Sequence, residues 1–384
     1  MDFELNEDQV AFSDMATAFA RSELEPNAAK WDEESFFPVD VIRKAGEMGF
    51  ASLYSPESAG GLGLSRLDSS IIFERLSMGC TSTTAYLTIH NMVTWMITSF
   101  AKPSVLERYA ESLISAQALG SYCLTEPNAG SDAASLKTTA KIEGDYYILN
   151  GSKVFISGAG STDVLVVMAR TGGPGARGVS AIVVDAHSEG ISYGRKEDKM
   201  GWNSQPTRMI SFDNVKVPVE NLLSEEGEGF VLAMKGLDGG RINIASCSLG
   251  TAQQALNQAR DYMQERKQFG KQIGDFQGLQ FRLADMATEL VAARQLVRLA
   301  ASKLDLGHKD ATTYCAMAKR FATDVGFKVC DEALQIFGGY GYIKEYPLER
   351  YVRDTRVHRI LEGTNEIMRV IIGRRLLADT DSEF

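Results

Sequence analysis

The stretch Tyr146-Tyr-Ile-Leu-Asn-Gly-Ser-Lys-Val-Phe-Ile-Ser157 marks a region where the chain has no helical pattern. Two β-rich runs, 146–149 and 153–156, flank Asn150-Gly151, and an Asn-Gly pair between such runs is a strong hairpin signal. Further β-rich runs follow at 164–169, 179–184 and 210–217, with no pattern of helical length between them. The sequence from about 120 to 227 therefore predicts a compact antiparallel barrel or sandwich.

Helical periodicity dominates on both sides of this region. Before it, the apolar spacing and the punctuating prolines predict helices over 6–24, 39–48, 67–78, 82–100 and 104–114. After it, longer helices are expected over 228–265, 278–306, 309–336 and 365–377. Helices of this length are typical of a bundle, so the predicted order is α, then β, then α.

Composition excludes several classes of function. The chain has 384 residues, more than a single hydrophobic core typically serves, so two or three domains are expected. Its content of 44% hydrophobic and 23% charged residues is ordinary for a globular protein. The net charge of -10 disfavours nucleic acid as a main partner. The apolar run 85–101 is interrupted by His90 and Asn91, so we expect a buried helix and not a membrane span.

The cysteines and the N-terminus predict where the protein works. The five cysteines are far apart and form no CxxC pair, so neither a zinc site nor a disulfide framework is expected, and a reducing compartment fits best. The acidic N-terminus resembles neither a secretory signal nor an Arg-rich transit segment.

The segment Arg359-Ile-Leu-Glu-Gly-Thr-Asn-Glu-Ile-Met368 carries a candidate catalytic group. Glu362 follows two apolar residues and precedes Gly363, and Thr364 is suited to cap the helix that follows. A carboxylate on such a bend can be desolvated, which raises its pKa and lets it act as a base. The alternative is a solvated glutamate that only complements the helix dipole.

Four other segments can be interpreted either as ligand-binding sites or as purely structural features. The loop Tyr122-Cys-Leu-Thr-Glu-Pro-Asn-Ala-Gly-Ser131 offers hydroxyls and backbone amides, or is a capped turn. Phe155 and Ser157 should share one face of a strand, because strand side chains alternate. Arg266-Lys-Gln-Phe-Gly270 and Phe337-Gly-Gly-Tyr-Gly341 end long helices, where they can contact an anion or serve as caps.

One formal motif is rejected on its context. Gly173-Pro-Gly-Ala-Arg-Gly178 matches GxGxxG, but a β-rich run follows it where a dinucleotide-binding fold needs a helix. It is predicted to be a hairpin loop.

Taken together, these segments resemble, in order and spacing, the acyl-CoA dehydrogenase family of flavoproteins. The resemblance covers 5–377 and rests on 122–131, 155–157, 266–270, 335–341 and 361–366; Asn128-Ala129 departs from the family's usual Gly-Ser but keeps its small, polar character. It implies an α+β multidomain fold, with an N-terminal all-α domain at 1–119, a middle antiparallel β-barrel at 120–227 and a C-terminal four-helix bundle at 228–384.

The resemblance also implies FAD as cofactor, bound in part by residues that reach across from a second subunit of a homotetramer, a dimer of dimers. By position, the FAD-binding residues would be Tyr122, Cys123, Leu124, Thr125, Gly130, Ser131, Phe155, Ile156, Ser157, Arg266, Phe276, Gln277, Gln335, Ile336, Phe337, Gly338, Gly339, Thr364, Asn365 and Glu366.

Glu362 matches the family's catalytic base. Some members place the base on another helix, where this chain has Gly240. The residues facing the acyl-CoA would be Ser131, Asp238, Gly239, Gly240, Arg241 and Arg374.

Three stretches, 79–86, 201–208 and 239–248, are similar to the branch of the family that oxidises isobutyryl-CoA to methacrylyl-CoA in valine catabolism. Electrons would pass to an electron-transfer flavoprotein, in the bacterial cytoplasm or the mitochondrial matrix. The alternatives are a dehydrogenase with another short or 2-methyl-branched substrate, an acyl-CoA oxidase, disfavoured by the chain's length, and a non-catalytic CoA-binding helical scaffold.

Overall fold

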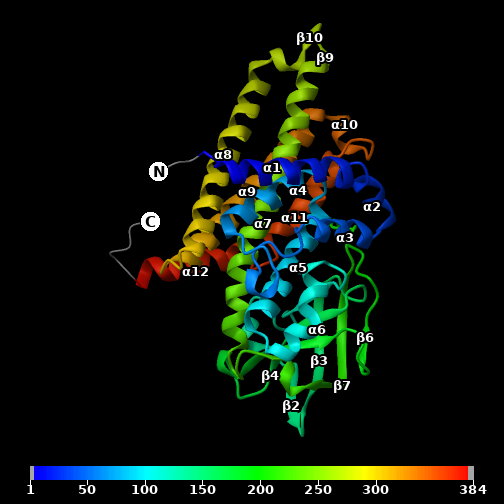
Figure 1. The fold of residues 1–384 in the computed structure, drawn as a ribbon. Coiled ribbons are helices and arrows are strands. Elements are labelled where there is room, and N and C mark those ends of the chain that lie inside the picture. Colours follow the sequence, from blue (N-terminus) through cyan, green and yellow to red (C-terminus); the bar gives the residue numbers. More distant parts are fainter. Residues whose placement is uncertain (1–3, 379–384) are drawn as a thin grey trace.

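The computed structural model describes residues 4–378, arranged as helices, then a β region, then helices (Figure 1). The N-terminal helices are α1 (Glu7–Phe19, continued by a π-helical turn, Ala20–Leu24), α2 (Ala28–Glu34), α3 (Val39–Glu47), α4 (Arg66–Gly79), α5 (Thr81–Phe100) and α6 (Pro103–Ile114). The periodicity predicted all of these except α2.

Local signals explain where several helices begin. Asn6 accepts a hydrogen bond from the backbone of Gln9 and completes a capping box at α1. Ser65 caps α4, and Pro103 occupies the first turn of α6, where its missing N–H costs nothing.

Helix α5 is buried along most of its length, and the Asn91 side chain forms hydrogen bonds with the backbone of Phe50 and Leu53. The prediction that 85–101 is a buried helix is confirmed.

The β region forms one eight-stranded sheet in the order β6-β7-β3-β2-β4-β5-β8, with β1 beside β4. Its strands are β1 (Gly120–Cys123), β2 (Thr139–Glu143), β3 (Tyr146–Ser157), β4 (Val164–Arg170), β5 (Val179–Asp185), β6 (Ile191–Tyr193), β7 (Thr207–Pro218) and β8 (Leu222–Leu223). The middle β domain is confirmed, and 173–178 lies between the antiparallel strands β4 and β5 as expected. However, β1 pairs with β4 in parallel, because the chain between them supplies a crossover that contains β2 and β3.

The hairpin predicted at Asn150-Gly151 is wrong. Both residues lie inside the single strand β3, at a register shift in its pairing with β7. Gly151 has φ 144°, and a methyl group there would overlap Thr138, so glycine is needed for a bulge and not for a turn. The actual tight turn is Gly144-Asp145, between the paired residues Glu143 and Tyr146.

Three long helices dominate the C-terminal region: α7 (Gly229–Glu265), α8 (Gln277–Asp305) and α9 (Ala311–Phe337). A two-stranded ribbon, β9 (Lys267–Gln268) and β10 (Lys271–Gln272), connects α7 to α8, and α10 (Gly339–Tyr342), α11 (Leu348–Arg356) and α12 (Asn365–Ala378) follow. Figure 1 shows α7 running from the β region to the β9–β10 ribbon at the opposite end of the molecule. No helix within residues 4–378 is long and apolar enough to cross a membrane.

Candidate active site

The predicted bend at Glu362 exists and is strained. The chain leaves a 3₁₀ turn at Val357–Arg359 and enters α12 through two consecutive left-handed residues, Glu362 (φ 56°) and Gly363 (φ 88°). A non-glycine residue in this conformation costs free energy, on the order of 1–3 kcal/mol, and such residues cluster at functional sites. Thr364 caps α12 as predicted, since its Oγ1 accepts a hydrogen bond from Ile367 N (3.3 Å).

The Glu362 carboxylate is unsatisfied. The residue as a whole is half-buried, yet its Oε2 is shielded from solvent and has no hydrogen-bond partner among the described residues. Burial raises the pKa of Glu362 to about 7, against the lowering effect of the Arg241 and Lys319 charges. A carboxyl group with this pKa and a free oxygen can accept a proton near neutral pH.

Helix α7 makes room for this carboxylate with a glycine. A methyl group built on Gly240 would overlap Glu362 Oε2. The next residue, Arg241, contacts the bend itself, because its Nε donates to the Glu362 carbonyl oxygen (3.4 Å). Its Nη1 binds Asp238 Oδ1 (2.6 Å), and Asp238 Oδ2 in turn accepts from Thr312 (2.6 Å). Asp238 and Arg241, predicted to face acyl-CoA, are therefore buried and engaged with each other beside Glu362.

Lys319 was not predicted from the sequence. This lysine of α9 is fully buried, and its Nζ donates to the Gly363 carbonyl oxygen (2.7 Å) and to Asn365 Oδ1 (2.9 Å). The Asn365 amide also donates to Thr323 Oγ1 (3.0 Å). Asn365, predicted to bind FAD, thus directs its side chain into the protein. A lysine within the apolar stripe of a predicted helix was the available signal.

Two tyrosines lie within the electrostatic reach of Glu362. Burial raises the pKa of Tyr122 well above its usual value, and the Glu362 charge adds to this rise. The Tyr122 hydroxyl is buried and has no partner in the described part of the chain. Burial also raises the pKa of Tyr54, whose hydroxyl accepts from Asn243 (3.1 Å) and whose ring stacks on the Arg66 guanidinium (3.4 Å). Tyr54 and Arg66 were not predicted.

Hydrogen bonds connect the loop 122–131 to strand β3. The Thr125 carbonyl accepts from Val154 N (2.9 Å), and the buried Lys153 Nζ donates to Glu126 Oε1 (2.8 Å) and to the Leu124 carbonyl (3.0 Å). The structure thereby brings together the two segments predicted to hold a flat ring. Gly130 and Ser131 are exposed, whereas the side chains of Cys123, Leu124 and Ile156 are buried and can offer a ligand only their backbone.

The backbone at Phe155 departs from regular strand geometry. It has φ 58° at a second register shift of β3, and its side chain is 69% exposed. Strand alternation alone cannot place Phe155 beside Ser157, because Phe155 lies in the bulge between Lys153 and Ile156. The exposure of Phe155, the burial of Ile156 and the partial exposure of Ser157 still fit one shared face.

The other predicted FAD residues lie far from Glu362 within one chain. Arg266 follows the end of α7, 26 residues beyond Gly240, which corresponds to about 39 Å along a continuous helix. Phe276 precedes α8 and packs against the bundle core that also contains Ile336 and Phe337 at the end of α9, and Phe337 stacks on Tyr262 in the last turn of α7. Arg266, Phe276, Gln277 and 335–339 therefore form a second cluster, separate from Glu362.

Glu366 and Arg374, predicted to contact FAD and acyl-CoA respectively, are both exposed residues of the final helix. Glu366 is exposed in the first turn of α12, next to the bend. Arg374 is exposed nine residues beyond the start of α12, about 14 Å along its axis. Arg374 therefore does not belong to the Glu362 cluster of its own chain.

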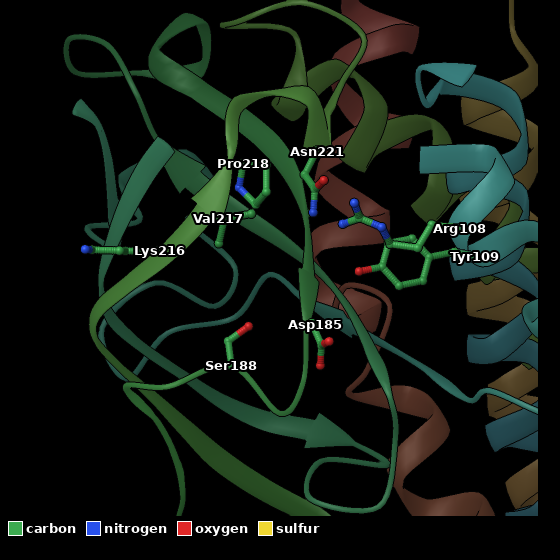
Figure 2. Close-up of a pocket in the computed structure, with 8 residues that line it drawn as sticks. All are labelled: Arg108, Tyr109, Asp185, Ser188, Lys216, Val217, Pro218 and Asn221. Carbon is green, nitrogen blue, oxygen red and sulfur yellow. The ribbon is translucent and has the colours of Figure 1, made fainter. Parts of the chain in front are cut away.

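Cavity size does not locate the site. A cavity of about 380 Å³ lies between α6 and the β region, lined by Arg108, Tyr109, Asp185, Ser188, Lys216, Val217, Pro218 and Asn221 (Figure 2). Another of about 550 Å³ lies between α8, α9 and α12. Neither contains a predicted residue. All five cysteines are free and buried, and no cluster suited to a metal ion occurs among the described residues.

The chain is similar to known proteins along nearly its whole length. The N-terminal, middle and C-terminal domain models of acyl-CoA dehydrogenase match residues 6–117, 121–215 and 227–377. The mitochondrial isobutyryl-CoA dehydrogenases of Bos taurus and Dictyostelium discoideum are 54% and 52% identical, each over 98% of this chain and 90% of the relative.

A solved chain described under the electron transferring flavoprotein of Acidaminococcus fermentans is 43% identical, with a TM-score of 0.96 over 99% of this chain and 100% of that one. The family models, taken together, account for nearly the whole described chain. The chain therefore belongs to the acyl-CoA dehydrogenase family, whose members are FAD-dependent flavoproteins.

Proposed function

We propose that Glu362 is the catalytic base of an FAD-dependent dehydrogenase that removes the α-proton of a short branched acyl-CoA. The observation that carries this proposal is the buried, unpaired Oε2 on a strained bend, in a group whose pKa is raised to about 7. The α-proton of a thioester is weakly acidic, so its removal needs a positioned base and a donor for the developing enolate oxygen.

The backbone of Glu362 is suited to supply that donor. Its N–H makes no hydrogen bond with any described residue, although the carbonyls of Glu362 and Gly363 are both engaged. A free N–H beside a free carboxylate oxygen can contact the thioester oxygen while the carboxylate takes the proton. Gly240 leaves the space that the carboxylate occupies.

The loop 122–131, whose Tyr122 lies within reach of the Glu362 charge, and the end of β3 fit a flat, partly polar ring such as the flavin of FAD. Tyr122 has a buried hydroxyl without a partner, Phe155 presents an exposed aromatic face, and the amides of Gly130 and Ser131 lie at the surface. When bound, FAD accepts the β-hydride. The residues of this chain hold the ring through 122–131 and 155–157 and keep the α-carbon within reach of Glu362.

The separation of the two clusters supports a cofactor site shared between subunits. A single FAD cannot contact both Glu362 and Arg266 of one chain across about 39 Å of helix. We propose that Arg266, Phe276, Gln277 and 335–339 complete the site of a second subunit, in a dimer of dimers. Arg266→Ala is expected to lower FAD retention and weaken the oligomer together, because a ligand at an interface is linked to assembly. Unchanged FAD content after gel filtration would contradict the shared site.

The proposed substrate is isobutyryl-CoA, oxidised to methacrylyl-CoA in valine catabolism. The relatives above 50% identity support this choice, and the chain described under the electron transferring flavoprotein supports such a flavoprotein as electron acceptor. The mitochondrial names of those relatives favour the mitochondrial matrix over the bacterial cytoplasm. Other short or 2-methyl-branched acyl-CoA substrates remain the second candidates.

Two measurements test the function. Glu362→Gln keeps the size of the side chain and removes its basicity, so turnover should fall by about 10²–10⁴-fold with FAD and acyl-CoA still bound. Glu189→Gln, an exposed loop residue, is the matched control and should keep full activity. Near wild-type turnover in Glu362→Gln excludes Glu362 as the base.

The substrate is tested by kcat/KM for isobutyryl-, 2-methylbutyryl-, butyryl-, isovaleryl- and octanoyl-CoA. Isobutyryl-CoA should give the highest value, and the one extra methylene of 2-methylbutyryl-CoA should cost about 1–3 kcal/mol of transition-state stabilisation. A maximum with isovaleryl- or octanoyl-CoA would reject the substrate but not the dehydrogenase.

A further inference from the structure

The bend that carries Glu362 is held from two sides by buried cations. Arg241 of α7 binds the Glu362 carbonyl, and Lys319 of α9 binds the next carbonyl, that of Gly363. Two consecutive left-handed residues are an unfavourable backbone state that persists only where surrounding contacts determine it. These two hydrogen bonds fix both peptide groups of the bend.

The two cations differ in what neutralises them. Arg241 is paired with the Asp238 carboxylate at 2.6 Å. Lys319 binds only neutral oxygens, the Gly363 carbonyl and the Asn365 amide, and it has no salt bridge among the described residues. Burial lowers the pKa of Lys319, and Glu362 is the strongest of the charges that oppose this lowering. A buried ammonium without a carboxylate in its contacts is costly and needs a compensating role.

We propose that Lys319 is a positioning residue for Glu362: its ammonium fixes the Gly363 carbonyl and the Asn365 amide, and so holds the carboxylate in the space beside Gly240. This inference rests on the proposed role of Glu362 as base. The positive charge of Lys319 also favours the ionised form of Glu362, the form that accepts a proton.

The effect of the Lys319 charge on the ionisation of Glu362 depends on all the charged and titratable groups around these two residues. They come from α7, α9, β1, the 3₁₀ turn before the bend, the start of α12 and the N-terminal region, and comprise Asp238, Arg241, Asp324, Tyr122, His358, Glu366 and Tyr54. Of these, Arg241 also lowers the pKa of Glu362, so removing Lys319 leaves one cation in place. The expected shift is therefore partial.

The first test is Lys319→Met in the FAD-loaded enzyme, with Lys328→Met as the matched control. Lys328 lies on the same helix but at the surface, where it pairs with Glu289. In Lys319→Met we expect kcat to fall at least about tenfold, KM to change less than about threefold, and the ascending limb of the pH–kcat/KM profile to move up by about one pH unit. Lys328→Met should match wild type in all three.

Lys319→Arg distinguishes charge from geometry. The guanidinium keeps the charge but differs in shape, so the pH limb should stay within about 0.3 units of wild type while kcat recovers only in part. If Lys319→Met does not fold, Lys319→Arg decides alone: an unmoved limb with a lowered kcat supports the proposal, and an unchanged kcat or a shift of one unit or more overturns it. A kcat and a pH limb in Lys319→Met equal to those of Lys328→Met also overturn it.

Thermal unfolding, which does not depend on turnover, tests the role of Lys319 separately from the role of Glu362 as catalytic base. The melting temperature of Lys319→Met should fall more steeply between pH 5 and pH 8 than that of wild type, and the added Glu362→Gln substitution should reduce the difference to the part that comes from Lys319 itself, whose own pKa burial lowers to about 7. If Glu362→Gln alone retains turnover, the proposed function fails. If Glu362→Gln is inactive and Lys319→Met is normal, only the role of Lys319 fails.

Discussion

The buried Glu126 and the half-buried Glu362 each lie near a fully buried lysine in this molecule, and their environments are opposite. Glu126 in the loop 122–131 accepts hydrogen bonds from Lys137 N (2.6 Å), Thr138 N (2.9 Å) and Lys153 Nζ (2.8 Å). Glu362 leaves Oε2 without a partner in the described residues. Burial raises the pKa of Glu126, but Lys153 and the hydrogen bonds more than offset it, whereas the pKa of Glu362 rises to about 7.

The difference shows that burial alone does not make a carboxylate reactive. Lys153 contacts its glutamate directly and locks a loop, so that carboxylate stays ionised and engaged. Lys319 contacts the backbone of the bend and leaves the carboxylate of Glu362 free. A buried group that is fully hydrogen-bonded stabilises the fold, and one that is left unpaired is available to a substrate.

The largest effect should follow from breaking the satisfied pair. Lys153→Met leaves Glu126 charged and buried, which typically costs about 3–5 kcal/mol. Urea unfolding and soluble yield measure this loss. The double variant Lys153→Met/Glu126→Gln should recover part of the stability, since it removes the uncompensated charge. A single variant as stable as wild type would show that the pair does not hold the loop.

The second prediction concerns Glu362 and pH. Its folded pKa of about 7 lies above the ordinary value of 4.5, so the folded chain retains a proton in this range that the unfolded chain releases. Stability therefore falls as pH rises from 4.5 to 7. Glu362→Gln removes this loss and should be more stable than wild type at pH 8, by up to about 3 kcal/mol, with no difference at pH 4. Thermal unfolding at the two pH values checks it; an equal difference at both would contradict it.

Glu126 should behave with the opposite sign. Because its folded pKa is lowered, its contribution is present above the unfolded value and is lost as pH falls through the folded value. Glu126→Gln should be less stable than wild type at pH 7, by about 1–3 kcal/mol, and the difference should shrink toward pH 3. Unfolding midpoints that stay equally separated at both pH values would argue against an ionised, hydrogen-bonded Glu126.

The smallest expected effect is on the space beside Glu362. Gly240→Ala should gain up to about 1 kcal/mol of helix stability but displace the carboxylate, so kcat should fall several-fold. Gly373→Ala on α12 is the control, because a methyl group there meets nothing within 4 Å. Both variants are compared by melting temperature and kcat; an unchanged kcat in Gly240→Ala would mean that the carboxylate accommodates the methyl group.

The sequence by itself determined the order of the three regions and the bend at Glu362. Helical and β periodicities are local properties of 10–20 residues, so the long helices α7, α8 and α9 could be predicted from them. The bend could be predicted because Gly363 and Thr364 carry their conformational preferences locally. The segments that carry the family resemblance are likewise contiguous runs of residues.

Only the tertiary structure decided whether each candidate side chain is free or engaged. Asn150-Gly151 locally favours a turn, but glycine also suits a bulge, and pairing with β7 selects the bulge. Arg241 and Asn365 were predicted to contact ligands, but their side chains form hydrogen bonds inside the protein, with Glu362 and Thr323 respectively, which are distant in sequence. Lys319 reaches Gly363 across 44 residues of chain. Hydrogen bonding and desolvation depend on groups brought together by folding, so no local pattern could predict that Glu362 is unpaired while Glu126 is satisfied.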